Sequence, residues 1–286
     1  MATVYLSTTG SDSYTYAQAQ NSATPWLTPG KVQTSATTGD TVSVASGTYT
    51  IGAGITFTKN FTWNAVSNGN AIFDFANVNY RIEFSSATQT FNGIKFYRGK
   101  HNPSYGAIFI HVTGNTYTHT FNDCIIDTMS LNSAVANLGG VFADNNCTGI
   151  NFVFNRCLFK EITYDTSASG TALFAFRNAD PTSGVQMNYC TTYLSSTAKP
   201  IEKIFNDAAS TNKPVFSGKG NAFKSEASIA VGATSCTMTY SGAYNITSFP
   251  ANTGNLTSSD PLFIDATNTN YNLRQLSPLI DLVVIS

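Results

Sequence analysis

The sequence predicts an all-β fold, namely a single-stranded right-handed parallel β-helix (β-solenoid) with about 28 to 33 residues per coil and a short N-terminal cap. Three observations predict it: a composition rich in Thr, Ser, Asn, Phe and Tyr, a short motif that returns at a nearly constant interval, and a second motif that alternates with the first. We therefore expect one elongated domain in 286 residues.

Composition also excludes some classes of partner. Only 11% of the residues are charged and the net charge is -1, so there is no basic field that would attract nucleic acid. No run of about 20 apolar residues is present that could cross a bilayer. The opening "MATVYLSTTGSDS" lacks a basic start followed by an apolar run, so we expect no export signal, no membrane partner and no nucleic-acid partner.

The first motif is an aromatic or other large apolar residue followed by Asn, seen as "FNDC", "FNRC" and "MNYC". Its copies start 28, 30, 33, 33 and 29 residues apart. They begin at Trp63, Phe91, Phe121, Phe154, Met187 and, in degenerate form, Phe216. This period is too short for the four strands of a propeller blade and fits a coil of about three short strands.

The second motif is an aliphatic residue followed by Phe, and it occurs once between successive copies of the first. Its five copies are Ile72-Phe73, Ile108-Phe109, Val141-Phe142, Leu173-Phe174 and Ile204-Phe205. The distance to the next copy of the first motif stays between 11 and 13 residues for the last four. The other interval varies, which indicates that insertions enter on one side of each coil, as in solenoids.

Stacked coils place equivalent residues about 4.8 Å apart, so the first motif predicts two columns of side chains. One is a ladder of side-chain amides from Asn64, Asn92, Asn122, Asn155 and Asn188. The other is an inward column of Cys124, Cys157 and Cys190, extended by Ile94 and Val66. No close cysteine pair of the zinc-ligand type occurs, so we expect free buried thiols, no metal and no cofactor.

The chain divides into an N-terminal cap and first coil (1–50), central coils (51–245) and closing coils (246–286). The stretch "TVYLSTTGSD" followed by "ATPWLTPGKVQTSATTGDTVSVASGTYT" resembles the opening of the pectate-lyase-like group of parallel β-helix proteins, and "SSDPLFIDATNTNYNLRQLSPLIDL" resembles their closing coils. In "TPGK", Pro29 and Gly30 stand where that group's capping helix carries helix formers, so we expect a short or displaced helix.

The resemblance implies a fold that serves lyases, hydrolases, epimerases, adhesins and phage tailspikes alike. The lyases of the group hold calcium with carboxylates beside an Arg or Lys base, and its hydrolases place Asp residues on adjacent coils. We align Asp123 with Gly93, Arg156 and Tyr189, and Asp74 with Ile110, Ala143 and Ala175. That alignment contains no in-register cluster of carboxylates, so we expect no catalytic residues. His101, His111 and His119 are not spaced as a metal set.

The variable loops offer the remaining polar groups on one side of the solenoid. Candidates for a ligand-binding or partner-binding face are Arg98, Lys100, His101, Tyr105, Glu161, Tyr164, Asp165, Tyr193, Lys199 and Glu202. Such groups on a rigid scaffold suit a surface polysaccharide or a protein neighbour. The alternative is that these are ordinary solvated loops.

Two classes of function remain. The first is a non-catalytic structural or host-attachment component of a bacteriophage virion, such as a spike, fibre, tail or capsid-decorating protein, made in the host cytoplasm and possibly a glycan binder. The second is a polysaccharide lyase or glycoside hydrolase, acting outside the cell as a depolymerase. Carboxylates or basic residues that converge from three consecutive coils would favour the second.

The chain ends in a run of apolar residues, Leu282, Val283, Val284 and Ile285. An uncovered apolar strand promotes aggregation. We therefore expect this segment to be buried against another chain, either in a homotrimer or on another virion protein. The competing expectation is that it folds back onto the last coil of its own chain.

Overall fold

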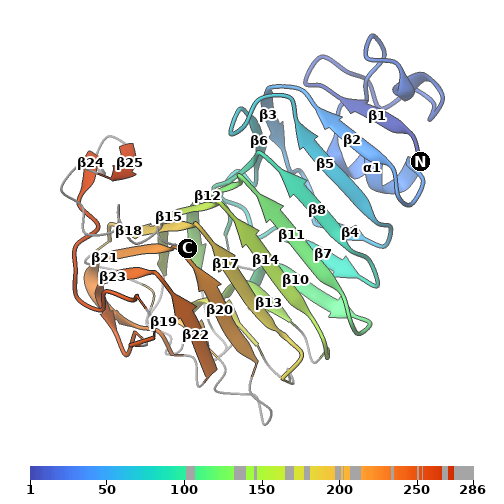
Figure 1. Cartoon of the computed structure of the whole chain (residues 1–286). Helices are drawn as coiled ribbons and strands as arrows, with labels where there is room; N and C mark the ends of the chain where they lie inside the picture. The colour runs from blue at the N-terminus through green and yellow to red at the C-terminus, as the bar shows by residue number, and fades with distance from the viewer. Residues whose placement is uncertain are drawn as a thin grey trace.

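The computed structural model confirms the predicted fold class, an all-β parallel β-helix (Figure 1). It describes residues 1–100, 107–131, 140–144, 147–164, 171–176, 181–196, 201, 203–206, 214–232, 235–249, 251–252, 254–265 and 270–273. Every strand pairing in this part of the chain is parallel except that of β24 (Phe263–Asp265) with β25 (Asn270–Leu273). No helix in the described ranges is long and apolar enough to span a membrane.

The strands form three faces of a solenoid, which we call faces A, B and C. Face A is a nine-stranded sheet. Faces B and C belong to one 14-stranded sheet, because the long strand β21 begins on face B beside β18 and ends on face C beside β19. Successive coils contribute one strand to each face in the order A, B, C.

Face A consists of β1 (Thr3–Leu6), β2 (Thr41–Val44), β5 (Phe61–Ala65), β8 (Gln89–Asn92), β11 (Thr118–Asn122), β14 (Asn151–Asn155), β17 (Gly184–Asn188), β20 (Val215–Lys219) and β22 (Ser235–Thr239). Face B consists of β3 (Gly47–Thr50), β6 (Ala71–Asp74), β9 (Ile94–Tyr97), β12 (Ile125–Leu131), β15 (Leu158–Tyr164), β18 (Thr191–Leu194), β21 (Ala222–Ala230) and β23 (Gly242–Thr247). Face C consists of β4 (Ile55–Phe57), β7 (Ile82–Ser85), β10 (Ala107–Thr113), β13 (Gly140–Asp144), β16 (Ala172–Ala175), β19 (Lys203–Asn206) and the end of β21.

A short cap precedes the first coil at the N-terminal end of the solenoid (Figure 1). It contains the 3-10 helix η1 (Gln18–Gln20) and the helix α1 (Pro29–Ser35). Helix α1 is only seven residues long, as expected from the "TPGK" sequence, and has Pro29 in its first turn. The Thr28 hydroxyl caps it by accepting a hydrogen bond from the Lys31 amide (3.2 Å).

The predicted asparagine ladder is present at the end of the face A strands. The amide nitrogen of each Asn donates to the side-chain oxygen of the Asn one coil earlier. The donor-acceptor distances are 2.6 Å for Asn92 to Asn64, 2.8 Å for Asn122 to Asn92, 2.8 Å for Asn155 to Asn122 and 2.9 Å for Asn188 to Asn155. The last four asparagines of the ladder are each followed by a residue with positive φ, namely Gly93, Asp123, Arg156 and Tyr189. The ladder therefore marks the tight corner between faces A and B.

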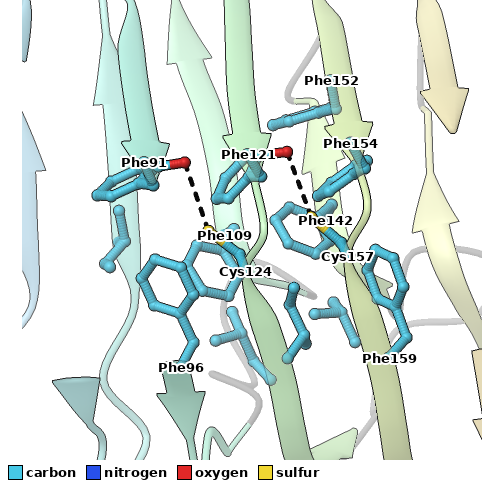
Figure 2. Close-up of a cluster of buried hydrophobic side chains, with 14 of the residues drawn as sticks. Phe91, Phe96, Phe109, Phe121, Cys124, Phe142, Phe152, Phe154, Cys157 and Phe159 are labelled. Atoms are coloured by element: carbon cyan, nitrogen blue, oxygen red, sulfur yellow. Dashed lines mark hydrogen bonds between the residues drawn. The ribbon is translucent and has the colours of Figure 1, made fainter. Parts of the chain in front are cut away.

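The interior is built from columns of aromatic rings, in which each ring lies on its counterpart in the next coil (Figure 2). Ring centroids are 5.2 Å apart for Phe91 and Phe121 and 4.9 Å apart for Phe121 and Phe154, with near-parallel planes. On face C, Phe109 and Phe142 stack at 4.6 Å. Because all five rings are fully buried, these columns form the core and hold the coils in register.

The cysteine column is also confirmed as free, buried thiols. The thiols of Cys124, Cys157 and Cys190 lie directly after the ladder corner. Each donates to a face A carbonyl oxygen of the preceding coil. Figure 2 shows the bonds from Cys124 to Phe91 (3.4 Å) and from Cys157 to Phe121 (3.2 Å). Cys190 donates to Phe154 in the same way (3.4 Å). Burial raises the pKa of Cys157 and of Cys190 well above the ordinary thiol value.

Two register assignments made from the first motif were wrong. Val66 is 71% exposed and does not extend the cysteine column, because the chain loops out at this corner and Ala71 pairs with Ile94 instead. Phe216 pairs with Val185, so Gly218 is the counterpart of Met187.

Phe73 pairs with Phe96 on face B, whereas Phe109 pairs with Ile82 on face C. The copies of the second motif therefore belong to two different columns, with Phe73 on face B and the other four on face C. Asp74 is aligned with Tyr97 and not with Ile110, and this correction changes the search for a functional site.

We predict that Asn155→Ala lowers the free energy of unfolding by about 1 to 3 kcal/mol, because it removes two ladder hydrogen bonds. Equilibrium denaturation measures the change. Gln186→Ala is the matched control, since Gln186 is exposed on the neighbouring strand β17, and it should change stability by less than about 0.5 kcal/mol. Equal stability of the two variants would contradict a structural role for the ladder.

Candidate functional site

The outer side of face B carries polar residues at one register position on seven consecutive strands, a set we call the polar row. Its members follow inward-facing residues such as Phe73, Phe96 and Phe159, which fill the core. Strand pairing places them side by side in the order Asp74, Tyr97, Asp127, Lys160, Tyr193, Lys224 and Tyr244. Because neighbouring strands lie about 4.8 Å apart, the row is a continuous polar line along the solenoid axis.

Asp74 begins the row in an ion pair with Arg98 of the next coil. The guanidinium binds both carboxylate oxygens, with Nε at 3.0 Å from Oδ1 and Nη2 close to Oδ2. The Ala76 amide also donates to Oδ1 (2.8 Å). Burial acts to raise the pKa of Asp74, but the hydrogen bonds from Arg98 and Ala76 outweigh it, so the net pKa is lower than usual.

Asp127 is the centre of a second ionic cluster. Its Oδ2 atom lies 2.7 Å from Lys95 Nζ and 3.4 Å from Lys160 Nζ, and its Oδ1 atom accepts from the Thr128 hydroxyl (2.9 Å). Asp127 is only 3% exposed. Both oxygens of this buried carboxylate therefore have partners, which offsets the cost of burying a polar group.

Tyr97 lies between these two clusters and contacts cations from both. Lys95 Nζ is 4.4 Å from the centre of the Tyr97 ring, and the Arg98 guanidinium carbon is 5.2 Å from it. These are cation–π distances. The part of the row from Asp74 to Lys160 therefore holds one aromatic ring fixed between two paired carboxylates.

The later part of the row is covered by the segment 260–263. Asp260 accepts from Lys224 Nζ at 3.0 and 3.1 Å, and the Phe263 ring packs edge-on against the ring of Tyr193 at 6.0 Å. The Tyr193 hydroxyl donates to Glu226 (3.1 Å). Burial, together with the charge of Glu226, raises the pKa of Tyr193 to about 12.

The structure brings together only some of the residues predicted from the sequence. Arg98 and Tyr193 contribute to the polar row, and Glu161 lies beside it, where it accepts from the Ser195 hydroxyl (2.6 Å). Lys100 forms a bridge with Ser130 of β12, and Tyr164 pairs with Leu131 at the end of β15, so both lie past the row along the chain. Outside the described residues are His101, Tyr105, Asp165, Lys199, Glu202, Leu282, Val283, Val284 and Ile285.

Sequence reasoning missed Asp74, Lys95, Tyr97, Asp127 and Lys160. A signal was present, because Tyr97, Asp127, Lys160 and Tyr193 each stand six residues after the first residue of the first motif. Asp74 breaks this spacing because of the loop at 66–70. The alignment of Asp74 with Ile110 was wrong, and the two carboxylates of the row, Asp74 and Asp127, are separated by Tyr97 in the described strands.

The ion pairs of the polar row limit the reactions that its side chains could catalyse. A general acid needs a raised pKa, whereas the pKa of Asp74 is lowered. A general base must lose its proton, whereas the hydrogen bond to Asp74 raises the pKa of Arg98. Within the described ranges no group of three or more His, Cys, Asp or Glu side chains could hold a metal ion.

Comparisons with known proteins give structural likeness alone. No protein-family model and no curated protein matches the sequence. Among solved structures, a rhamnogalacturonan lyase is 12% identical with a TM-score of 0.37, over 90% of this chain and 85% of that one. Pectin methylesterase PemA from Erwinia chrysanthemi is 12% identical with a TM-score of 0.44, over 85% and 71%. Pectate lyase Pel9A is 12% identical with a TM-score of 0.39, over 97% and 90%.

A buried histidine pair lies inside the solenoid, away from the polar row. His111 Nδ1 and His119 Nε2 are 3.0 Å apart, and both side chains are fully buried. Phe84 stacks on the His119 ring at 4.0 Å. Burial lowers the pKa of His111, and burial followed by the proximity of His111 lowers that of His119 further, so the pair is neutral in the folded protein.

We predict that the free energy of unfolding decreases as the pH falls from 7 to 5. The unfolded chain takes up protons near pH 6.5, whereas the folded pair resists them, so the unfolded state binds more protons in this window. Each proton contributes a slope of at most about 1.4 kcal/mol per pH unit. Asp40 and Asp74, whose pKa values are lowered, lose their contribution only below about pH 4.

Urea denaturation at pH 5, 6, 7 and 8 measures this dependence. The stability of His119→Phe should depend less on pH, because the variant lacks one buried titrating group. Phe is chosen because the residue that pairs with His119 on the next coil is Phe152. A wild-type stability that is the same at pH 5 and pH 7 would show that the pair costs nothing to protonate.

Proposed function

We propose that this protein is a non-catalytic glycan-binding solenoid, whose binding surface is centred on the partly exposed Tyr97 and Arg98 in the part of the polar row from Asp74 to Lys160. The observation that carries the proposal is that Tyr97 stands between two ionic clusters whose carboxylates are both bound to cations. Such a surface offers fixed hydrogen-bonding groups and an aromatic ring but no free acid or base.

Pairing does not exhaust the hydrogen-bonding capacity of these groups. Arg98 uses Nε and Nη2 on Asp74, and its side chain is 43% exposed, so other N–H groups of the guanidinium are available. The Lys95 side chain is also partly exposed, at 21%. Donors and acceptors held side by side match the vicinal hydroxyls of a sugar, and Tyr97 provides an apolar ring to one side.

The direction of the row suits a chain-like ligand. Its groups repeat about every 4.8 Å along the solenoid axis, one from each coil. An extended glycan lying along the axis would meet a new set of groups at every coil. The clusters contain charges of both signs, which favours a hydroxyl-rich glycan over a polyanion.

Attachment to a surface polysaccharide fits such a ligand. A bacteriophage spike, fibre, tail or capsid-decorating protein is one setting for it, as a homotrimer or with other virion proteins, and an extracellular protein is another. The residues expected to form the subunit interface, Leu282 to Ile285, lie outside the described residues.

Catalysis by a polysaccharide lyase or hydrolase is the second candidate, and one observation favours it. Charged residues from consecutive coils do converge in the polar row, including Asp74, Lys95 and Asp127. Two strand spacings, or about 9 to 10 Å, separate the backbones of Asp74 and Asp127, close to the upper limit for an inverting glycosidase. The ion pairs count against this candidate, because each carboxylate already holds a cation.

We predict that Tyr97→Ala weakens glycan binding by at least about tenfold. Affinity electrophoresis through gels that contain neutral or acidic polysaccharides measures the retardation of the wild type and the variant. Tyr5→Ala is the matched control, because Tyr5 is a partly exposed residue on the outer side of face A, and it should bind as the wild type does. Equal retardation of all three proteins, or none with any polysaccharide, would contradict the proposal.

The same polysaccharides test the second candidate. New reducing ends or unsaturated products after incubation would show cleavage. Loss of that cleavage in Asp127→Asn would then assign catalysis to the row and replace the binding proposal.

A further inference from the structure

A pocket with a volume of about 600 Å³ lies at the C-terminal end of the solenoid, beside Tyr244, the last residue of the polar row. It is formed by strand β23, by Ser228 of β21, and by residues of the closing segment that include Thr257 and Ser258. Its size lies in the range that accommodates small-molecule ligands. Asp260 and Phe263, which cover the row at Lys224 and Tyr193, follow this wall of the pocket along the chain.

A break in strand register builds the pocket. Strands β21 and β23 pair up to Lys224 and Tyr244, and the pairing resumes at Ile229 and Ile246. Four residues of β21 therefore face the single residue Asn245 of β23, and the extra chain bulges away from the sheet. Asn245 spans the gap, has positive φ (56°), and donates from its side-chain amide to the Ser225 carbonyl (2.9 Å).

The described lining contains no charged side chain and is rich in hydroxyl groups. Ser228, Ser248, Thr257 and Ser258 supply hydroxyls that make no hydrogen bond within the described residues. Thr247 is different, because its hydroxyl already donates to the Ile229 carbonyl (3.2 Å). Tyr244 adds an aromatic ring, and Lys224 Nζ lies 5.6 Å from the centre of that ring.

We propose that this pocket binds a neutral saccharide of one or two rings. Unpaired hydroxyls on several walls match the many donors and acceptors of a sugar, and the Tyr244 ring provides a face against which the apolar side of a sugar ring can pack. The described lining offers no charged side chain that would pair with a uronic acid, a phosphosugar or an amino sugar, so it provides no selection for a charged ring. The pocket shares Tyr244 with the end of the polar row, but this proposal does not depend on glycan binding at Tyr97.

Saturation-transfer NMR on the full-length protein tests the proposal. The probes are glucose, galactose, mannose, N-acetylglucosamine and their common disaccharides at millimolar concentration, with glucuronic acid and glucosamine as charged counterparts. We expect transfer to at least one neutral probe and none to the charged ones. No transfer to any neutral probe, or equal transfer to the charged counterpart of the one that binds, overturns the proposal.

Two variants locate the binding. Ser258→Trp fills the pocket from an exposed position that contributes nothing to the core. It should weaken the binding of the saccharide that shows transfer by at least about tenfold. Thr118→Trp places the same ring at an exposed position on face A and should have no effect. Tyr97→Ala should also leave this binding unchanged. Retention of binding in Ser258→Trp, or its loss in Tyr97→Ala, places the saccharide elsewhere and overturns the assignment.

Discussion

Parallel, in-register stacking of the coils is the constraint on which the rest of this structure depends. Each residue lies one strand spacing from its counterpart, so a side chain is tolerated only if it packs well against a copy of itself or a suitable neighbour. Amides meet this condition because they both donate and accept, and aromatic rings meet it by stacking, as the column of Phe91, Phe121 and Phe154 does.

Charges of one sign do not meet the condition, since neighbours at about 4.8 Å repel. The order of the polar row reflects this. Tyr97 separates Asp74 from Asp127, Lys160 follows Asp127 directly, and Tyr193 separates Lys160 from Lys224. No two like charges are neighbours in the row. The same rule that fixes the fold therefore limits which charged surfaces it can present.

The sequence was sufficient to predict the fold class, the period, the asparagine ladder and the cysteine column, because these repeat at fixed spacing from a motif that recurs once per coil. It was insufficient where an insertion moved the register. The loop at 66–70 displaced Asp74 from the common spacing, and the resemblance of Ile72-Phe73 to Ile108-Phe109 hid the fact that they belong to different faces. The pocket could not be predicted at all, because it depends on a register break between two strands, β21 and β23, that no periodicity shows.

The asparagine ladder has a direction as well as a spacing. Every amide nitrogen from Asn92 to Asn188 points towards the N-terminal end and every side-chain oxygen towards the C-terminal end, so the side-chain dipoles add along the axis as peptide dipoles do in an α-helix. The negative end of this macrodipole lies at Asn188. The residue that pairs with Asn188 in the next coil is Lys219, a cation placed where the summed dipole favours positive charge. The ladder thus has electrically distinct ends, although the net charge of the chain is only -1.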